Sequence, residues 1–549
     1  MKQLVRTGGW ALSCLALVVC VACGSSEGPS DNGAAGALSA AGAQSAAGAN
    51  NAAGAAGSVM TSGGMGGALA GASAGGASGN AGAVSGGAGG VAGSAGGAGA
   101  SSAPLPTGTP TTVLLDGATL TKTQQDLAGG ASGTAEQKAA FKNLVAAADI
   151  ALKAGTWSVT TKDAQFVVND DPHEYVSWGP YWWPSDANPP SKAGTFGKCP
   201  YVSHDGQHNP DVAKVTDRHG LHASSEALLE LSLAWYLTGN TAYADQAELV
   251  ARTWYLNAAT AMNPSMAHAQ SQGPCGNGTA TGIIEAAGYL TDALDGLSIL
   301  ALDTRASGWS AADQAGMKAW LTKYVTFLKT SSQGKAENVA TNNHGSWFDA
   351  TLSSIYLYLG DTESAKTLVT ASRKRMDSQM ESDGRMLEEL ARETSWHYEN
   401  YGAAAFCRIA GVAKKVGVDI WGYTTPKGAT LAKAIAYMIP TAITANPPGP
   451  WAQYNDITKP FDPAYQAEAY YSIRAAAEYG NNAQAKAVFA QAPYAVTVPG
   501  HYCAGDRFPL GSDFCGITAG AAPFSDLQAP GEPAVDMWPL LPTCRMPIN

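Results

Sequence analysis

The chain has 549 residues, of which 45% are hydrophobic and 14% are charged, and its formal net charge at pH 7 is −11. This acidic balance excludes the broad basic footprint that nucleic-acid binding needs. An anionic substrate is still permitted, because a few Arg, Lys and His side chains in a cleft can hold carboxylates while the rest of the surface is acidic.

The first 23 residues predict a lipoprotein signal peptide. Lys2 and Arg6 precede an apolar run over residues 10–22, which is too short to span a membrane and is typical of an export signal. The run ends in CVACG, which resembles a bacterial lipobox with Cys23 as the lipidated residue. By the same resemblance, Gly24 favours the outer membrane. We expect an exported outer-membrane lipoprotein, facing the periplasm or the cell surface, whose only membrane contact is its lipid anchor.

Residues 24–103 are almost entirely Gly, Ala and Ser, with Glu27 and Asp31 as their only charges. A segment without large apolar side chains cannot offset the entropy lost on ordering, so we predict a disordered linker. Residues 104–549 are then one catalytic domain with an irregular C-terminal extension. An even set of cysteines in this region of an exported protein favours disulfides, with the pairing left open. The six are Cys199, Cys275, Cys407, Cys503, Cys515 and Cys544.

Apolar residues at spacings of three and four, separated by short Gly, Asn or Asp breaks, predict helix after helix in this region. Ser310 and Asp313 have the spacing of a capping box before one of these helices. Strands do not alternate with helices, which argues against a doubly wound sheet or a β/α barrel. The predicted helices cover residues 221–237, 243–256, 282–302, 317–329, 347–359, 364–380, 387–416, 429–439, 465–479 and 483–491.

This pattern predicts an all-α fold, and specifically an α/α toroid in which antiparallel helix pairs surround a cleft. A helical solenoid is the alternative, but the chain lacks the fixed residue period that solenoids show. Two long loops rich in aromatic residues and Pro, residues 170–209 and 446–463, are expected at the mouth of the toroid, where loops carry function.

Residues 175–184, YVSWGPYWWP, are too crowded with aromatic residues and Pro to form a regular helix. Flat rings suit the apolar faces of pyranose sugars, and their polar tips suit sugar hydroxyls. We therefore assign Tyr181, Trp182 and Trp183 to substrate binding. The alternative is that the loop is a hydrophobic plug on the domain.

A second motif, NNHGSW at residues 342–347, is followed about fifty residues later by ELAR at 389–392 and by Tyr398. Together they supply amide, imidazole, guanidinium and phenol groups without an obvious acidic pair. That set suits proton abstraction beside a carboxylate better than it suits hydrolysis. Donors that neutralise the C6 carboxylate of a uronate acidify the C5 hydrogen, and a base and an acid can then act at C5 and O4.

These motifs, with GPYWWP at 179–184, DGQHNP at 205–210 and MNP at 262–264, resemble the alginate lyase superfamily of α/α-toroid polysaccharide lyases. The match runs in order from about residue 170 to about residue 440. The resemblance implies cleavage of a β-1,4-linked polyuronate by β-elimination, leaving an unsaturated sugar at the new non-reducing end, and it implies no cofactor. The partner would be an anionic polysaccharide.

Carried over by motif, the resemblance implies that Asn343, His344 and Arg392 surround the substrate carboxylate and that Tyr398 transfers the proton. The best-known alginate lyases place this tyrosine one residue further from the arginine, so the chain is more similar to a sister group that includes glucuronan lyases. The same shift leaves Tyr401 as a less favoured proton carrier. Mannuronate and glucuronate both remain open as the substrate sugar.

The stereochemistry supports a single proton carrier. In β-1,4-linked mannuronate or glucuronate, H5 is axial and O4 is equatorial, so the proton and the leaving group depart on the same side. Tyrosine titrates near pH 10, so Tyr398 needs a His or Arg nearby to favour the phenolate. In guluronate the two groups lie on opposite sides, and His344 would have to be the base.

Structural roles compete with these assignments. Asn343 and His344 can simply cap the helix that follows, and Arg392 can pair with Glu388 or Glu389. Arg392 and Tyr398 would also lie about 240° apart on a continuous helix, so their convergence requires a break near Thr394 and Ser395.

Four further groups are considered for the site. Arg218, His219 and Gln270 are assigned to substrate binding, with His222 beside them. Two sets, His204 with Asp205 and His208, and Asp217 with His219, have spacings that could bind metal, but no closed ligand set is visible, so no metal is predicted. Tyr454, Asp456 and Lys459 follow a Pro-rich segment and are weaker candidates for closing the cleft.

Two other functions remain open. A glycoside hydrolase on the same toroid needs two facing acids, for which Asp349, Glu388 and Asp456 are available. A non-catalytic surface protein that binds polysaccharide would keep the aromatic loop and make Tyr398 dispensable. The sequence does not decide between endo and exo attack or define the oligomeric state.

Overall fold

The computed structural model describes residues 104–128, 133–187, 196–276, 279–442, 463–490, 540 and 542–544. All of them belong to one compact unit that spans residues 94–549. The predicted signal peptide with Cys23, the predicted linker, and Tyr454, Asp456 and Lys459 lie outside the described residues. Within the described ranges, no helix combines the length and the apolar character needed to cross a membrane.

The described part of the chain is mainly helical, which confirms the all-α prediction. Its α-helices are α1 (Gly117–Ala128), α2 (Ala135–Ala154), α3 (Asp217–Thr238), α4 (Thr241–Ala251), α5 (Ala287–Leu300), α6 (Ala311–Thr330), α7 (Ser332–Val339), α8 (Asn343–Leu359), α9 (Thr362–Gln379), α10 (Leu387–Leu390), α11 (Ser395–Lys415), α12 (Leu431–Ala442), α13 (Pro463–Glu478) and α14 (Ala483–Ala490). The predicted capping box forms at α6, where Ser310 and Asp313 bond reciprocally.

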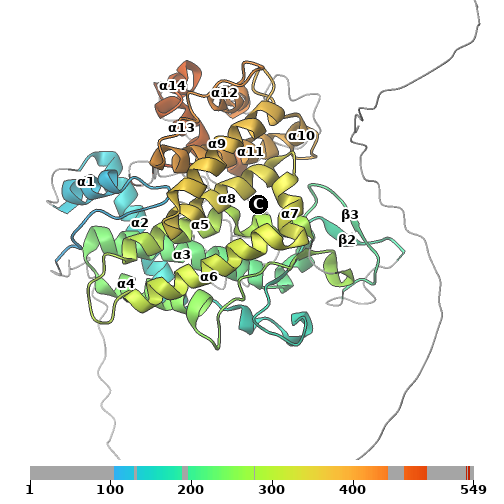
Figure 1. The fold of residues 1–549 in the computed structure, drawn as a ribbon, viewed down its shortest axis with the longest axis horizontal. Coiled ribbons are helices and arrows are strands. Elements are labelled where there is room, and N and C mark those ends of the chain that lie inside the picture. The colour runs from blue at the N-terminus through green and yellow to red at the C-terminus, as the bar shows by residue number, and fades with distance from the viewer. Residues whose placement is uncertain are drawn as a thin grey trace, which may run out of the picture. The chain divides into compact units, whose positions relative to one another are not determined.

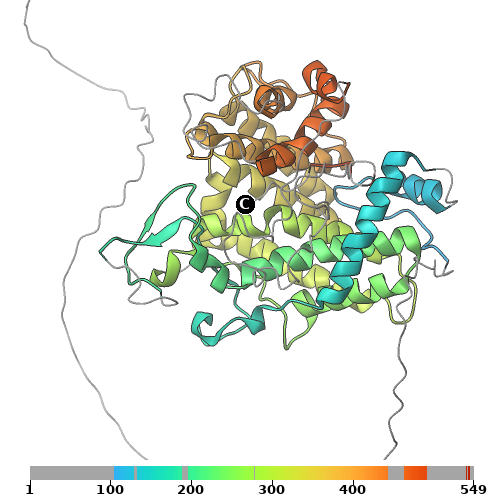
Figure 2. The ribbon, with the colours of Figure 1, turned by 180° about the vertical axis from the view of Figure 1, so that it is seen from behind.

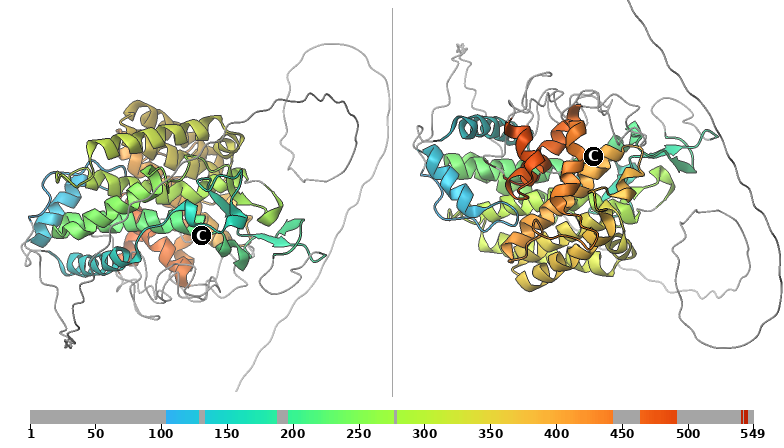
Figure 3. Two further views of the ribbon diagram at one scale, coloured as in Figure 1. Left: turned by 90° about the horizontal axis from the view of Figure 1, so that it is seen from below. Right: turned by 90° about the horizontal axis from the view of Figure 1, so that it is seen from above.

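The helices form two layers, as an α/α toroid requires. α3 packs against α5, α5 against α8, α8 against α11, and α11 against α13. α4, α9 and α12 cover α3, α8 and α11 from outside. The inner helices α3, α5, α8 and α11 are buried around most of their circumference, whereas α6 and α9 bury one face. Figures 1 and 3 show this succession of helices.

The main error in the predicted helices concerns residues 387–416, which were expected to form one helix. The structure divides them into α10 and α11, with Thr394 in a non-helical conformation (φ −112°, ψ 60°) just before α11. This is the break that convergence of Arg392 and Tyr398 requires. Helices α1, α2 and α7 lie outside the predicted ranges, although a capping box formed by Thr134 and Gln137 marks the start of α2.

The aromatic loop, residues 170–209, contains short strands, in agreement with the prediction that residues 175–184 form no regular helix. β1 (Val176–Trp178) pairs in parallel with β4 (His268–Ser271), and β2 (Trp182–Pro184) pairs antiparallel with β3 (Tyr201–Ser203). In Figures 1 and 2 the β2–β3 hairpin lies at the opposite side of the helices from α1.

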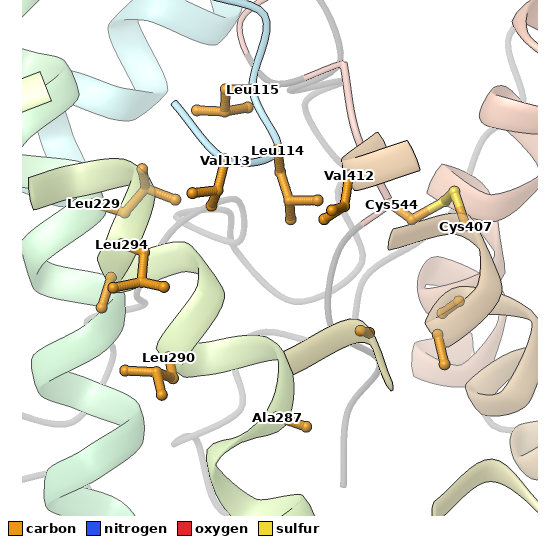
Figure 4. Close-up of a cluster of buried hydrophobic side chains, with 14 of the residues drawn as sticks. Val113, Leu114, Leu115, Leu229, Ala287, Leu290, Leu294, Cys407, Val412 and Cys544 are labelled. Carbon is orange, nitrogen blue, oxygen red and sulfur yellow. A yellow bond between two sulfur atoms is a disulfide. The ribbon is translucent and has the colours of Figure 1, made fainter. Parts of the chain in front are cut away.

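The segment before α1 completes the core. Val113 and Leu114 lie between Leu229 of α3, Leu290 and Leu294 of α5, and α11 (Figure 4). Asp295 of α5 holds this segment, because its carboxylate accepts the backbone N–H groups of Val113, Leu114 and Leu115 at 2.5, 3.1 and 2.9 Å. Burial raises the pKa of Asp295 to about 6, against the opposing effect of these bonds.

The prediction of disulfides is confirmed for four of the six cysteines. Cys199 bonds to Cys275, with Cα atoms 5.4 Å apart, and Cys407 bonds to Cys544, with Cα atoms 6.0 Å apart. The second bond ties α11 to the C-terminal segment (Figure 4). The other two cysteines, at positions 503 and 515, lie outside the described residues.

Candidate active site

The break between α10 and α11 brings Arg392 and Tyr398 into contact. Tyr398 lies in the first turn of α11, and Arg392 lies in the linker before it. Arg392 Nη2 donates to the Tyr398 hydroxyl at 2.8 Å, and its guanidinium carbon lies 3.7 Å from the centre of the Tyr398 ring. Arg392 therefore supplies the cation that is expected beside this phenol.

Tyr181, which is assigned to substrate binding, contacts Tyr398. Its hydroxyl lies 2.7 Å from that of Tyr398, and either oxygen can donate. Burial raises the pKa of both hydroxyls, Tyr398 more strongly, and Arg392 opposes the rise in each case. Desolvation outweighs the cation, so both rings are neutral at pH 7 in the free protein. The two hydroxyls form one coupled pair.

Arg392 is paired with neither Glu388 nor Glu389. Its Nε and Nη2 donate to the two carboxylate oxygens of Asp205 at 2.8 and 2.6 Å. Burial disfavours ionisation of Asp205, but the bonds from Arg392 outweigh it, so the pKa of Asp205 is lowered. The next residue, Gly206 (φ +71°), allows this approach, because a Cβ there would lie 3.1 Å from Glu393 Cβ.

Asn343 and His344 open α8, but neither side chain caps it. The cap is Asn342, whose Oδ1 accepts from the backbone N–H of His344 at 3.3 Å. His344 Nδ1 lies 2.8 Å from the Glu337 carboxylate of α7. A side chain at Gly345 would meet the Ala340 carbonyl oxygen at 2.2 Å, so the motif requires glycine there.

Asn343 is held by Glu389 of α10. Its backbone N–H and its side-chain Nδ2 donate to the two Glu389 carboxylate oxygens at 2.5 and 2.6 Å. Its Oδ1 is buried and has no hydrogen-bond partner among the described residues. Burial raises the pKa of Glu389 to about 7, while the bonds from Asn343 and the charges of Arg392 and His344 oppose the rise.

Glu389 therefore connects the start of α8, which carries Asn343, to the segment after α10, which carries Arg392. In the sequence, Glu389 stands within ELAR, where pairing with Arg392 is the only role predicted for it. Its position in the same motif as Arg392 was the available signal. Only the fold shows that its carboxylate faces the amide at the start of α8.

Trp182 and Trp183 lie on β2 opposite Ser203 and Val202 of β3. Both are partly exposed, and Trp183 Nε1 donates to the Gln207 carbonyl oxygen at 2.8 Å. Both residues of this strand therefore remain partly accessible to solvent.

Arg218 and Gln270 belong to a buried polar cluster around Glu285. The Glu285 carboxylate accepts from Tyr175 and Ser177 at 2.8 and 2.5 Å, and Arg218 Nε lies 3.7 Å from it. Gln270 has a left-handed backbone (φ +50°) and donates its N–H to Ser177 at 2.8 Å. The charge of Arg218 also opposes the rise that burial causes in the pKa of Tyr181.

His219, which is also assigned to substrate binding, is half-buried in the first turn of α3. Within the described ranges, no group of three or more His, Cys, Asp or Glu residues could hold a metal ion. Asp205 pairs with Arg392, and the ring of His208 packs edge-on against Tyr181, with the ring centres 5.1 Å apart.

The fold and these motifs define a class of enzyme. The alginate lyase family model matches residues 158–451, more than half of the chain, and the chain belongs to this family. An alginate lyase from Bacteroides ovatus is 30% identical, with a TM-score of 0.61 over 70% of this chain and 96% of that chain. Alginate lyase A1-III from Sphingomonas species A1 is 17% identical, with a TM-score of 0.42 over 69% and 90%. No curated protein matches the chain.

The protein is therefore a polysaccharide lyase whose substrate is an anionic polysaccharide. Membership of this family excludes the two alternative functions, a glycoside hydrolase and a non-catalytic binding protein. The acids considered for hydrolysis fit that outcome: Asp349 is buried in a pair with Arg375 at 2.6 Å, and Glu388 is exposed. Asp456 lies outside the described residues.

Proposed function

We propose that this lyase cleaves a β-1,4-linked polymannuronate or glucuronan by β-elimination, with Tyr398 as the proton carrier. The observation that carries the proposal is the environment of the Tyr398 hydroxyl. It receives a hydrogen bond from Arg392 and lies against the Tyr181 hydroxyl. A phenolate at this position can accept from both groups, which stabilises the basic form that the reaction needs.

Three donors serve the substrate carboxylate in this proposal: Arg392, Asn343 and His344. Each already faces a protein carboxylate, from Asp205, Glu389 and Glu337 respectively. The side chains of Arg392 and His344 are 24% and 16% exposed. Tyr398 and Asn343 are buried. The C6 carboxylate of a bound substrate then competes with Asp205 for the Arg392 guanidinium.

The proposed reaction proceeds in two proton steps. Tyr398, as phenolate, takes the C5 proton, and the electron pair of that C–H bond forms the C4–C5 double bond as the C4–O4 bond breaks. The new Tyr398 hydroxyl then returns the proton to O4 of the leaving sugar. Donors on the carboxylate stabilise the negative charge that develops as H5 departs.

One residue can perform both steps only when H5 and O4 lie on the same side, as in mannuronate and glucuronate. Guluronate would need a second base on the opposite side. In that case the bond between His344 Nδ1 and Glu337 would leave Nε2 to accept the proton. The proposal therefore includes weak or no activity on polyguluronate.

The test is a screen of purified protein on polymannuronate, polyguluronate, glucuronan and hyaluronan, followed by ultraviolet absorbance, because elimination creates a conjugated uronate. Tyr398→Phe is assayed in parallel. We expect absorbance to rise on polymannuronate or glucuronan and to stay flat for the variant. Activity confined to polyguluronate, or wild-type rates in the variant, would contradict the proposed mechanism.

We also propose that the enzyme is exported and anchored through an acylated Cys23. The charged start, the apolar run over residues 10–22 and the lipobox-like CVACG support this localisation. The Gly-rich residues 24–103 would then separate the catalytic unit from the membrane surface.

A further inference from the structure

The amide of Asn343 points its groups in an unexpected way for a carboxylate binder. Both of its donors, the backbone N–H and Nδ2, are used on Glu389. The atom left without a hydrogen-bond partner among the described residues is Oδ1, which is an acceptor. Asn343 is 1% exposed, so this oxygen is also shielded from water. A buried acceptor repels a carboxylate, whereas the proposed function needs a donor.

The Asn343 amide can present a donor to the substrate if it turns by 180° about its last side-chain bond. This turn exchanges the positions of Oδ1 and Nδ2 with almost no change in shape. After the turn, Nδ2 is free for substrate and Oδ1 faces Glu389. An ionised Glu389 has no proton to offer to Oδ1. A protonated Glu389 can donate to Oδ1 from one oxygen, while its other oxygen still accepts from the Asn343 backbone N–H.

We propose that Glu389 is a positioning residue that takes up a proton when substrate binds, and that its O–H then holds the Asn343 amide with Nδ2 toward the substrate carboxylate. This inference rests on the proposed role of Asn343 as a carboxylate donor. It adds a residue that never needs to touch the sugar.

The charges around Glu389 balance so that one additional charge nearby can change its protonation state. Arg392, between α10 and α11, and His344 of α8 favour the ionised form of Glu389. Glu337 of α7 faces His344, and the buried Glu399 of α11 interacts with Glu389 as a like charge. Burial dominates and brings the pKa of Glu389 to about 7. A substrate carboxylate adds another like charge, which raises the pKa further and favours protonation.

The first test is Glu389→Gln, with Glu389→Ala as the matched variant. Gln supplies a permanent donor for Asn343 Oδ1 and an acceptor for the backbone N–H, so it imitates the protonated acid. We expect Gln to retain activity and Ala to lose most of it. The ratio of kcat/KM in the Gln variant to that in the wild type should be flat below pH 7 and rise above it, by up to about tenfold per pH unit, because kcat/KM reports groups of the free enzyme.

Taking this ratio cancels the contribution of Tyr398, which both proteins share. An inactive but folded Gln variant would show that the ionised acid is needed, and a ratio that stays flat across pH would show that Glu389 does not titrate during binding. Either result overturns the inference. Asn343→Ala tests the proposed function separately from the role of Glu389. Normal activity in that variant would reject the role of Asn343 as a carboxylate donor.

A second measurement covers the case in which Glu389→Gln does not fold. Tyr398→Phe, which should bind without turnover, is titrated with a mannuronate tetrasaccharide by calorimetry at pH 8 in two buffers of different ionisation enthalpy. A glucuronate tetrasaccharide replaces it if the screen selects glucuronan. We expect uptake of close to one proton, and less in Glu389→Ala combined with Tyr398→Phe. Binding without proton uptake would refute the inference.

Discussion

Arg392 donates to the Tyr398 hydroxyl at 2.8 Å while its guanidinium lies 3.7 Å from the centre of the same ring. One side chain thus fixes both the position of the ring and the direction of its oxygen. The same Arg392 is bound at two points by Asp205. Tyr398, Arg392 and the loop that carries Asp205 are therefore joined by direct contacts. A substitution at one of them should alter the behaviour of the others.

Tyr398→Phe should keep the fold and oligosaccharide binding but lose nearly all turnover, because the ring remains and the only titrating atom is removed. Tyr401→Phe is the matched control. Tyr401 lies one turn further along α11, where its ring packs against Trp347 with the ring centres 5.2 Å apart. Initial rates from ultraviolet absorbance, with circular dichroism for folding, distinguish the two variants. A larger loss in Tyr401→Phe would transfer the proton-carrier role to that residue.

Arg392→Lys should lower kcat strongly even though it keeps the charge. Lysine cannot hold Asp205 at two points and Tyr398 at a third, because it lacks the planar fork of arginine. Loss of one comparable donor to a developing oxyanion costs about 2.7–4 kcal/mol in other enzymes. Arg373→Ala is the control, because that side chain lies on α9 and donates to the Asp419 carbonyl oxygen. Rates within twofold of the wild type in Arg392→Lys would argue against the clamp.

Asp205→Asn should shift the acid limb of the kcat/KM profile to lower pH. Tyr398 works as phenolate, so the rate rises as pH approaches its pKa. The charge of Asp205 raises that pKa, and removing the charge lowers it. Asp211→Asn serves as the control, because Asp211 pairs with Lys214 at 2.7 Å. An acid limb that stays in place, or moves to higher pH, would mean that Asp205 does not influence the proton carrier.

Asp295→Ala should destabilise the fold, because three buried backbone N–H groups lose their acceptor, at about 1–3 kcal/mol for each group left unpaired. Asp116→Ala provides a graded comparison. It removes the cap on Thr119 N–H at the start of α1 and should cost about 1 kcal/mol. Urea unfolding gives both free energies. Equal losses in the two variants would show that the N-terminal segment contributes little to the core.

Cys23→Ala should release the protein from the membrane fraction into a soluble fraction, because the proposed anchor is the lipid on that cysteine. Fractionation of cells that express the full chain, followed by immunoblotting, measures the distribution. Cys20→Ala is the control, since Cys20 is not the predicted acylation site. Membrane association that persists in Cys23→Ala would remove the lipoprotein proposal.

The sequence alone determined the all-helical class, the family and the motif residues. These properties rest on local patterns: apolar spacing for helices, the run NNHGSW at the start of α8, and ELAR before Tyr398. Local geometry also required a break near Thr394, and the structure contains it. Such features depend on neighbours a few residues apart, whose conformational preferences the sequence carries directly.

The tertiary structure decided which groups meet. Arg392 finds Asp205, 187 residues away, and Tyr398 finds Tyr181, 217 residues away. Glu389 reaches Asn343 because α10 and α8 are brought together in the toroid. Contacts at such separations depend on how whole helices pack and where loops return. A burial-driven change, such as the raised pKa of Tyr398, cannot be assigned before that packing is known.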